Sequence, residues 1–187
     1  MWNFINMKLV YKRDIEYISN RETSHSLLAE DKIITEARRY SPSLHSASVF
    51  LSHSHLDENI VRPMVVFLRS RGVDVYVDWM DNTMSKETSG ETAAKLKEKI
   101  KMNDKFLFLA TENSIKSKWC NWEIGYGDAE KYIDKIAVFP LLDNNGIWNG
   151  QEYLEIYPSI QKKDNTDDFV LVYPNGTTIS LNDWLLK

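Results

Sequence analysis

Several features that mark particular classes of protein are scarce in this sequence. Its single cysteine, Cys120, can form neither an intrachain disulfide nor, by itself, a zinc site. No apolar run approaches the ~20 residues that cross a bilayer, and the first six residues lack the basic and apolar stretches of a secretory signal. These absences predict a soluble, cytoplasmic protein that does not associate with membranes.

Glycine, proline and basic charge are also limited. With 7 Gly and 5 Pro among 187 residues, the chain is neither collagen-like nor mucin-like. A net charge of −4 and a pI near 5.6 exclude a generally basic surface, so we expect no nucleic-acid partner. Hydrophobic residues make up 43% of the chain and aromatic residues 12%. This composition predicts a sizeable core, in one domain or one domain with appendages.

The order of apolar and polar residues divides the chain into three zones. Residues 1–45 are mixed, and apolar side chains recur there at helical spacing, which predicts a helical N-terminal extension. These side chains are Leu27, Leu28, Ile33, Ile34 and Ala37. The Ser-Pro-Ser sequence at 41–43 marks its end. Residues 143–187 form a C-terminal extension, in which the pattern of 169–181 predicts a β-hairpin and that of 182–186 a short helix.

The middle zone, residues 46–142, alternates between short apolar runs and amphipathic stretches. Strands are predicted at 47–51, 73–77, 106–110 and 136–141. Helices are predicted from about Ile60 to Gly72, at 91–101 and at 122–132, and a polar loop at 78–89. The continuous apolar run at 106–110 is typical of a parallel strand that is covered on both faces. The order therefore predicts an α/β fold with a doubly wound parallel sheet.

One helix of this zone also allows a prediction about individual side chains. In the helix at 91–101, the spacing of Ala94, Leu96 and Ile100 places these residues toward the core.

Polar and aromatic residues follow the strands of the predicted sheet. Ser52 and His53 come after the first strand, Asp78 and Trp79 after the second, and residues 118–123 enter the helix after the third. In open α/β sheets, ligands bind beyond the carboxyl ends of the strands. These residues therefore form the candidate site.

Three of these segments carry a resemblance to a known family. Val49–Ser54 followed by Asp57 resembles the opening strand and loop of TIR (Toll/interleukin-1 receptor) domains. Val75–Trp79 followed by 88–91 resembles their second strand and BB loop, and Ser117–Glu123 resembles their third box. The resemblance covers about residues 46–142 and implies a flavodoxin-like fold.

The resemblance also implies an activity, because many bacterial and plant TIR domains cleave the nicotinamide–ribose bond of NAD. The family's catalytic glutamate corresponds to Glu123. Breaking this bond develops positive charge on the ribose, which a nearby carboxylate can stabilise. Burial between Trp119 and Trp122 would tune the pKa of that carboxyl. NAD would be a consumed substrate and not a cofactor, and the sequence holds no glycine-rich phosphate loop of the Rossmann kind.

Six further residues are candidates for binding the substrate. Ser52 and His53 could contact the ribose or phosphates, and Asp78 could accept hydrogen bonds from the ligand. Trp79 could stack on a planar base, since an indole face attracts a cationic pyridinium. Trp119 and Trp122 flank the glutamate in the third box.

Each candidate also has a purely structural interpretation. A glutamate early in a helix can simply offset the helix dipole, Trp119 and Trp122 can belong to the core, and Cys120 can be a small buried side chain. Asp57 is expected to cap or begin the first helix.

Two other kinds of site were weighed. His53 and His55 lack the partners of a familiar metal-ligand set, so no metal is expected. Asp78 could be a phospho-acceptor, as in response regulators, but the acidic pair that such sites need after the first strand is missing.

Three classes of function remain open. The first is a stand-alone TIR enzyme like the signal generators of antiphage systems such as Thoeris. It would make ADP-ribose, a cyclic isomer or a conjugate that activates a separate effector, and it would assemble through TIR–TIR contacts. The second is a non-catalytic adaptor that works by homotypic contacts of its BB loop, residues 81–89. The third is an enzyme like the nucleoside deoxyribosyltransferases, which also use a carboxylate at an N-glycosidic bond.

Overall fold

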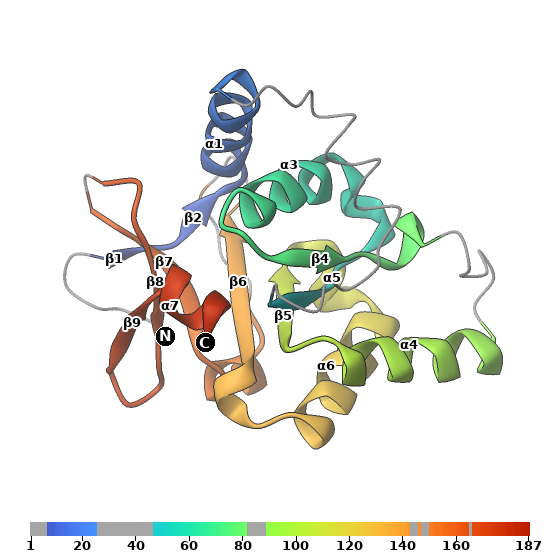
Figure 1. The fold of residues 1–187 in the computed structure, drawn as a ribbon. Helices are drawn as coiled ribbons and strands as arrows, with labels where there is room; N and C mark the ends of the chain where they lie inside the picture. The colour runs from blue at the N-terminus through green and yellow to red at the C-terminus, as the bar shows by residue number, and fades with distance from the viewer. Residues whose placement is uncertain (1–6, 26–46, 82–88, 143–145, 147–149, 165) are drawn as a thin grey trace.

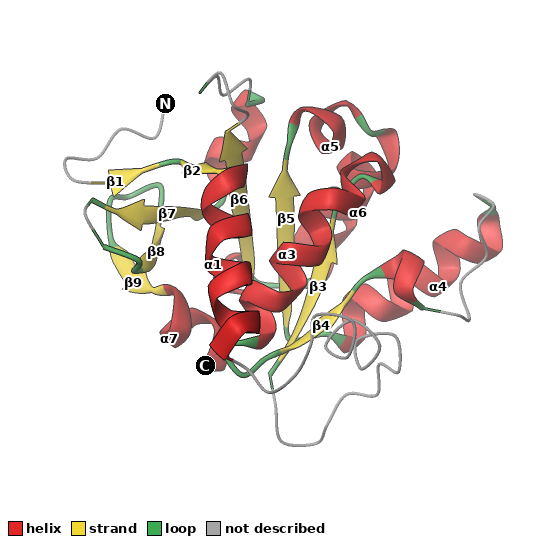
Figure 2. Cartoon of the chain, turned by 90° about the horizontal axis from the view of Figure 1, so that it is seen from above, coloured by secondary structure: helices red, strands yellow, loops and turns green. Residues whose placement is uncertain are grey.

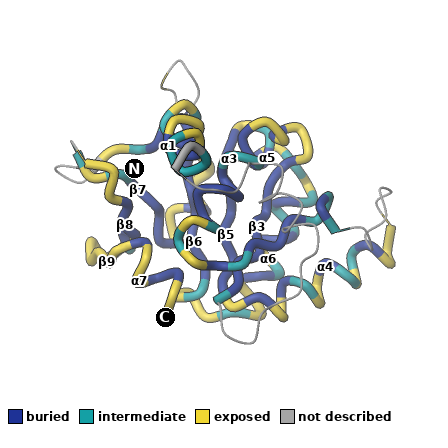
Figure 3. Tube along the Cα trace, turned by 45° about the horizontal axis from the view of Figure 1, so that its top comes forward, coloured by how far each residue is buried: buried dark blue, intermediate teal, exposed yellow. Residues whose placement is uncertain are grey.

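A sheet of parallel strands lies at the centre of the computed structural model, which describes residues 7–25, 47–81, 89–142, 146, 150–164 and 166–187 (Figure 1). The parallel strands are, in spatial order, β4 (Asp74–Tyr76), β3 (Ser48–Ser52), β5 (Lys105–Ala110), β6 (Ile136–Leu142) and β7 (Ser159–Lys163). The first four confirm the predicted strands and the doubly wound α/β fold. Every residue of β3, β5 and β6 is buried, as expected for strands covered on both faces (Figure 3).

Alternate residues of the central strands pack into two separate hydrophobic cores, one on each face of the sheet. On one face Val49 and Leu51 pack under α3 (Glu58–Arg69) and α1 (Lys12–His25), which lie side by side above the sheet (Figure 2). On the other face Phe50 stacks between Tyr76 and Phe106, with ring centroids 5.4 Å apart in both pairs. Because side chains alternate along a strand, one apolar run supplies both cores.

The second core is covered by α4 (Gly90–Met102) and α6 (Lys118–Glu130), and α5 (Glu112–Lys116) precedes α6. The helix predicted at 122–132 begins earlier, at Lys118. The side chain of Ser117 accepts a hydrogen bond from the Cys120 amide and caps the helix there. Leu96 and Ile100 of α4 are buried as predicted. The prediction for Ala94 was wrong, since that residue is exposed.

The segment after β4 is less open than predicted. Asp78–Met80 forms a 3₁₀ turn, η2, that buries Met80, so the polar loop begins only after this turn. Residues 82–88 of that loop lie outside the described residues.

Both flanking zones join the same sheet. The predicted hairpin and final helix are confirmed as β8 (Phe169–Val172), β9 (Thr178–Ser180) and α7 (Leu181–Leu186). The N-terminal zone supplies β1 (Met7–Lys8), which pairs with β7, and β2 (Val10–Tyr11), which pairs with β6. These two strands and β7 were not predicted. The apolar side chains that suggested helices at 27–37, and the break at 41–43, lie outside the described residues, and the domain boundaries stay predictions.

The remaining described segments are short. They are the 3₁₀ turns η1 (His55–Asp57), η3 (Ile133–Lys135) and η4 (Glu152–Ile156). Within the described ranges, the helices are all too short or too polar to span a bilayer.

Candidate functional site

Glu123 and Ser52 meet where α6 crosses the carboxyl end of β3. Ser52 is the last residue of its strand, and Glu123 lies in the second turn of the helix. The hydroxyl of Ser52 donates a hydrogen bond of 2.6 Å to Oε2 of Glu123, and both residues are buried. The predicted edge of the sheet thus brings together two residues that are far apart in the sequence.

Burial dominates the electrostatics of Glu123. The residue is 6% exposed, and desolvation of the charged form raises the pKa of its carboxyl to about 8. The hydrogen bond from Ser52 lowers this pKa, and the nearby Asp78 raises it. Among the described residues no cationic group pairs with Glu123. A ligand that brings positive charge into the site would therefore stabilise the charged form of the Glu123 carboxyl.

His53 and Asp78 lie next to this pair. The ring Nδ1 of His53 is 2.9 Å from the carbonyl oxygen of Leu51, and its Nε2 is 3.4 Å from Oδ1 of Asp78. A carbonyl only accepts hydrogen bonds, so Nδ1 carries a proton. The buried Nε2 faces the carboxylate of Asp78 but makes no hydrogen bond.

Trp79 contacts both Asp78 and His53. Its backbone amide donates to Asp78, and its ring meets His53 edge-on at a centroid distance of 6.4 Å. The guanidinium of Arg62 lies 5.2 Å from the centroid of the indole ring. A planar base that stacked on this face of Trp79 would therefore have to displace Arg62. The N–H of the same indole is buried and has no hydrogen-bond partner.

Trp119 and Trp122 lie on the same helix as Glu123 and face α4. They line a groove of about 510 Å³ between α4 and α6, together with Gly90, Ala93, Ala94, Lys97 and Lys118. Their rings pack edge-on at 5.4 Å, and Trp122 stacks on Tyr126 at 5.9 Å. The groove explains why Ala94 is exposed. Glu123 is buried but is not among the residues that line this groove, and its burial between the two indoles stays a prediction.

Cys120 has the structural role expected for it. Its thiol is buried and lies 3.2 Å from the carbonyl oxygen of His53, to which it donates. Burial raises the pKa of this thiol to about 12. The side chain is therefore a neutral thiol at physiological pH and not a nucleophile.

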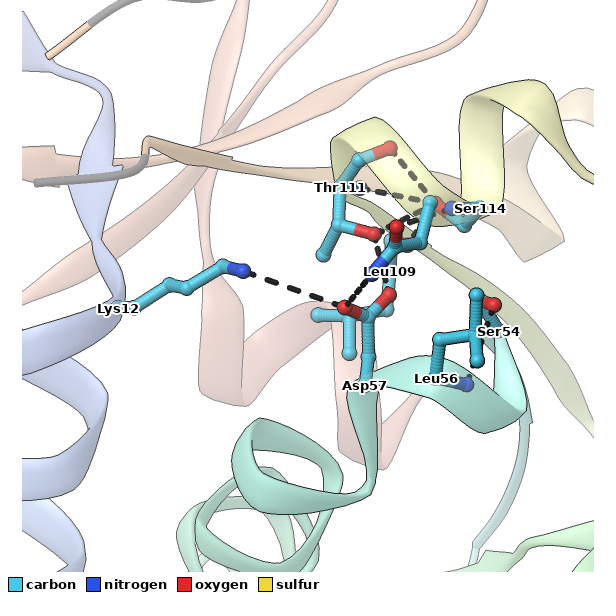
Figure 4. A network of polar contacts seen from close by, with 8 residues as sticks. Lys12, Ser54, Leu56, Asp57, Leu109, Thr111 and Ser114 are labelled. Carbon is cyan, nitrogen blue, oxygen red and sulfur yellow. Dashed lines mark hydrogen bonds and ion pairs between the residues drawn. The ribbon is translucent and has the colours of Figure 1, made fainter. Parts of the chain in front are cut away.

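Asp57 lies beside the site and makes contacts that were not predicted. It precedes α3, as expected, but its carboxylate makes no capping hydrogen bond. The buried carboxylate instead accepts from the side chains of Thr111 and Asn113, at the carboxyl end of β5, and Nζ of Lys12 lies 3.9 Å away (Figure 4). The sequence offers only a weak signal for this contact, namely that Thr111 and Asn113 follow a predicted strand.

Two curated relatives and one family profile match this chain. A relative from Bacillus cereus (strain MSX-D12), named "Probable 3' cyclic ADP-D-ribose synthase ThsB'", is 37% identical over 118 residues, which are 61% of this chain and 60% of the relative. A protein of Cytobacillus dafuensis named for cyclic ADP-D-ribose synthase activity, TIR2, is 28% identical over 81 residues, 42% of this chain and 21% of that protein. The chain thus spans about 60% of the first relative and a fifth of the second.

The family profile described as TIR domain matches residues 49–169. This range contains β3 through the start of β8, with Ser52, Asp78 and Glu123 at the carboxyl edge of the sheet. With this match over most of its length, the chain belongs to the TIR domain family.

Proposed function

We propose that this protein cleaves the nicotinamide–ribose bond of NAD, with Glu123 as the catalytic carboxylate. The observation that carries the proposal is the buried carboxyl of Glu123, which accepts a hydrogen bond from Ser52 and has no cationic partner in the described structure. Positive charge on the pyridinium, and then on the ribose, supplies the missing counter-charge. The names of the two relatives favour a cyclic ADP-ribose as the product.

The reaction that these residues support begins with heterolysis of the C–N bond. The bonding electrons leave with nicotinamide, which departs as a neutral molecule, and the ribose becomes an oxocarbenium ion. The carboxylate of Glu123 stabilises this ion, and the hydroxyl of Ser52 holds the carboxylate in place. Water can then attack the anomeric carbon to give ADP-ribose, or an atom of the same molecule can attack it to give a cyclic isomer.

The other candidate residues divide between two places. His53 follows Ser52 in the chain and contacts Asp78 and Trp79, and this proximity supports a role for the three residues in binding the reacting ribose. Trp119 and Trp122 offer aromatic surface in the neighbouring groove between α4 and α6, where an adenine or nicotinamide ring could rest. NAD is consumed in this scheme, so no separate cofactor is required.

We also propose a biological setting for this activity. The product would act as a diffusible immune signal in antiphage defence, made in the cytoplasm and detected by a separate effector. The TIR domains would assemble into a homo-oligomer. The support for this setting is the similarity to the relative named ThsB'.

The direct test is to incubate the protein with NAD and to measure the released nicotinamide by chromatography. Glu123→Gln keeps the size of the side chain but removes the negative charge, and we expect it to lower turnover about 1000-fold. Glu112→Gln is the matched control, because Glu112 is exposed on α5 and pairs only with Lys116. Mass spectrometry of the product distinguishes hydrolysis from cyclisation. Equal turnover of Glu123→Gln and wild type would remove Glu123 from the mechanism, and no turnover in any assembly state would favour an adaptor.

A further inference from the structure

A second polar cluster lies beside the Glu123 site and takes no part in the proposed chemistry. Its centre is Asp57, which is only 1% exposed although it carries a carboxylate. The side chains of Thr111 and Asn113 donate to its two oxygens, the latter over 2.7 Å. Placing a carboxylate in the interior is unfavourable unless its oxygens are paired, so this arrangement is tightly defined.

The cluster joins the two segments that carry the reactive pair. Asp57 ends the 3₁₀ turn η1, which follows Ser52 after a short connection. Thr111 begins α5, and α5 leads directly into α6, the helix of Glu123. The hydrogen bonds of Asp57 therefore fasten the loop after β3 to the segment that positions Glu123.

The donors of the cluster are themselves held firmly. The side chain of Thr111 accepts from the amide of Ser114, and the amide of Thr111 donates back to the Ser114 hydroxyl, which is a complete capping box. The same hydroxyl donates to the carbonyl oxygen of Leu109 at 2.7 Å. These contacts join Asp57 to the end of β5, and Figure 4 shows the network.

The cation that faces the Asp57 carboxylate is Lys12, which precedes the residues matched by the TIR profile. Lys12 lies at the start of α1, and its Nζ is 3.9 Å from Oδ1 of Asp57. Among the described residues it is the one cation within ion-pair distance of this carboxylate. The Lys12 side chain is 30% exposed and that of Asp57 only 2%, so solvent screens this pair less than a surface ion pair.

We propose that Asp57 is a positioning residue for the Ser52–Glu123 pair, and that Lys12 makes the N-terminal segment part of the support of the active site. Asp57 holds η1 against α5, and this contact fixes the distance between the Ser52 hydroxyl and the Glu123 carboxylate. Lys12 attracts the buried carboxylate and helps to hold it in place. The inference rests on the proposed function, because the effect of positioning is read through NAD cleavage.

The test compares steady-state kinetics of Asp57→Ala, Asp57→Asn, Lys12→Met and the Lys12→Met/Asp57→Asn double variant. We expect Asp57→Ala to lower kcat about tenfold and leave KM within about twofold, because misplaced catalytic groups slow the chemical step. Asp57→Asn should recover part of the loss, since its amide oxygen still accepts one hydrogen bond. Lys12→Met should lower kcat about threefold in the wild type and have no further effect beside Asp57→Asn. Lys116→Met, at an exposed lysine on α5, is the control and should leave kcat unchanged.

Hydrogen–deuterium exchange gives a readout that does not depend on activity. In Asp57→Asn and Lys12→Met, amides of residues 52–57 and 111–114 should exchange faster than in the wild type, and those of β6 should not. If the wild type releases no nicotinamide, the proposed function fails and exchange alone decides the inference. Unchanged exchange, or an unchanged kcat in an active enzyme, would overturn the role of Asp57. An equal effect of Lys12→Met with and without Asp57→Asn would overturn the role of Lys12.

Discussion

The two sides of helix α6 differ sharply in chemistry. One side buries Cys120, Glu123 and Ile124 against the sheet, and there the Glu123 carboxyl accepts its hydrogen bond from Ser52. The adjoining side packs Trp119 and Trp122 partly against the second core and presents them to the groove beside α4. The first side has a buried ionisable group, whereas the second has aromatic surface beside a groove.

This difference separates two tasks within one helix. The buried side is suited to stabilise charge, because desolvation strengthens electrostatic interactions. The groove side is suited to hold a flat ring, because indole faces offer apolar surface. Changes on the buried side should therefore act on kcat and pH dependence, and changes on the groove side on KM.

The strongest test of the buried side is the pH dependence of stability. The pKa of the Glu123 carboxyl rises from an ordinary value of 4.5 to about 8 on folding. Between these pH values the native state holds a proton that the unfolded state has lost. The contribution of the Glu123 carboxyl to the free energy of unfolding is therefore fully present below pH 4.5 and disappears as the pH rises through 8. The difference in unfolding free energy between wild type and Glu123→Gln should fall by about 4 kcal/mol from pH 5 to pH 9.

Urea unfolding at pH 5, 7 and 9 measures this difference. Parallel pH curves for the two proteins would mean that Glu123 titrates normally, and the contrast between the two sides of α6 would then disappear.

The next largest effect is expected for Ser52→Ala. Its hydroxyl lowers the pKa of Glu123, so its removal should raise that pKa further. The rising limb of kcat/KM, which reports the free enzyme, should move to higher pH, and activity at pH 7 should fall about tenfold. A pH–rate profile is the measurement, and Ser70→Ala, at the exposed end of α3, is the control. A drop in activity with no shift of the limb would show that Ser52 acts otherwise than on the Glu123 carboxyl.

Trp122→Ala tests the groove side. We expect KM for NAD to rise about fivefold, because one stacking surface is lost, while kcat and the pH profile stay close to those of the wild type. Steady-state kinetics across pH would reveal the opposite pattern, a lower kcat with an unchanged KM, if the groove belonged to the chemical step.

The smallest effect concerns Lys97, whose ammonium lies 4.9 Å from the ring centroid of Tyr126 and 5.9 Å from that of Trp122. Lys97→Met should change KM about twofold at low ionic strength and less in high salt, because exposed charges are screened. A salt-independent change would instead point to altered shape of the groove.

The sequence was sufficient to predict the parts of the fold that rest on apolar pattern. Runs such as 106–110 and 136–141 are continuous because both faces of the strands are covered, so they could be read directly. The strand β7 was hidden because two of its buried residues, Ser159 and Gln161, are polar and bond to each other. The two-residue strands β1 and β2 are too short to show any period.

The candidate site was predictable in location but not in contacts. Topology alone places Ser52, Asp78 and Glu123 at the same edge of the sheet. Which side of α6 faces β3 depends on how the helix lies across the strands, and this decides that Glu123 meets Ser52 while the indoles face α4. Asp57 resembled a helix cap because the same residue type serves both roles, and only the structure places it against Thr111.

The pairing of β2 with β6 has a consequence for how the chain is made. Val10 is synthesised long before its partner Leu141. Closing so long a loop is slow, so the N-terminal strand should dock near the end of folding. Nascent chains that pause before β6 emerges would carry an unpaired strand, and they should depend most on chaperones during synthesis.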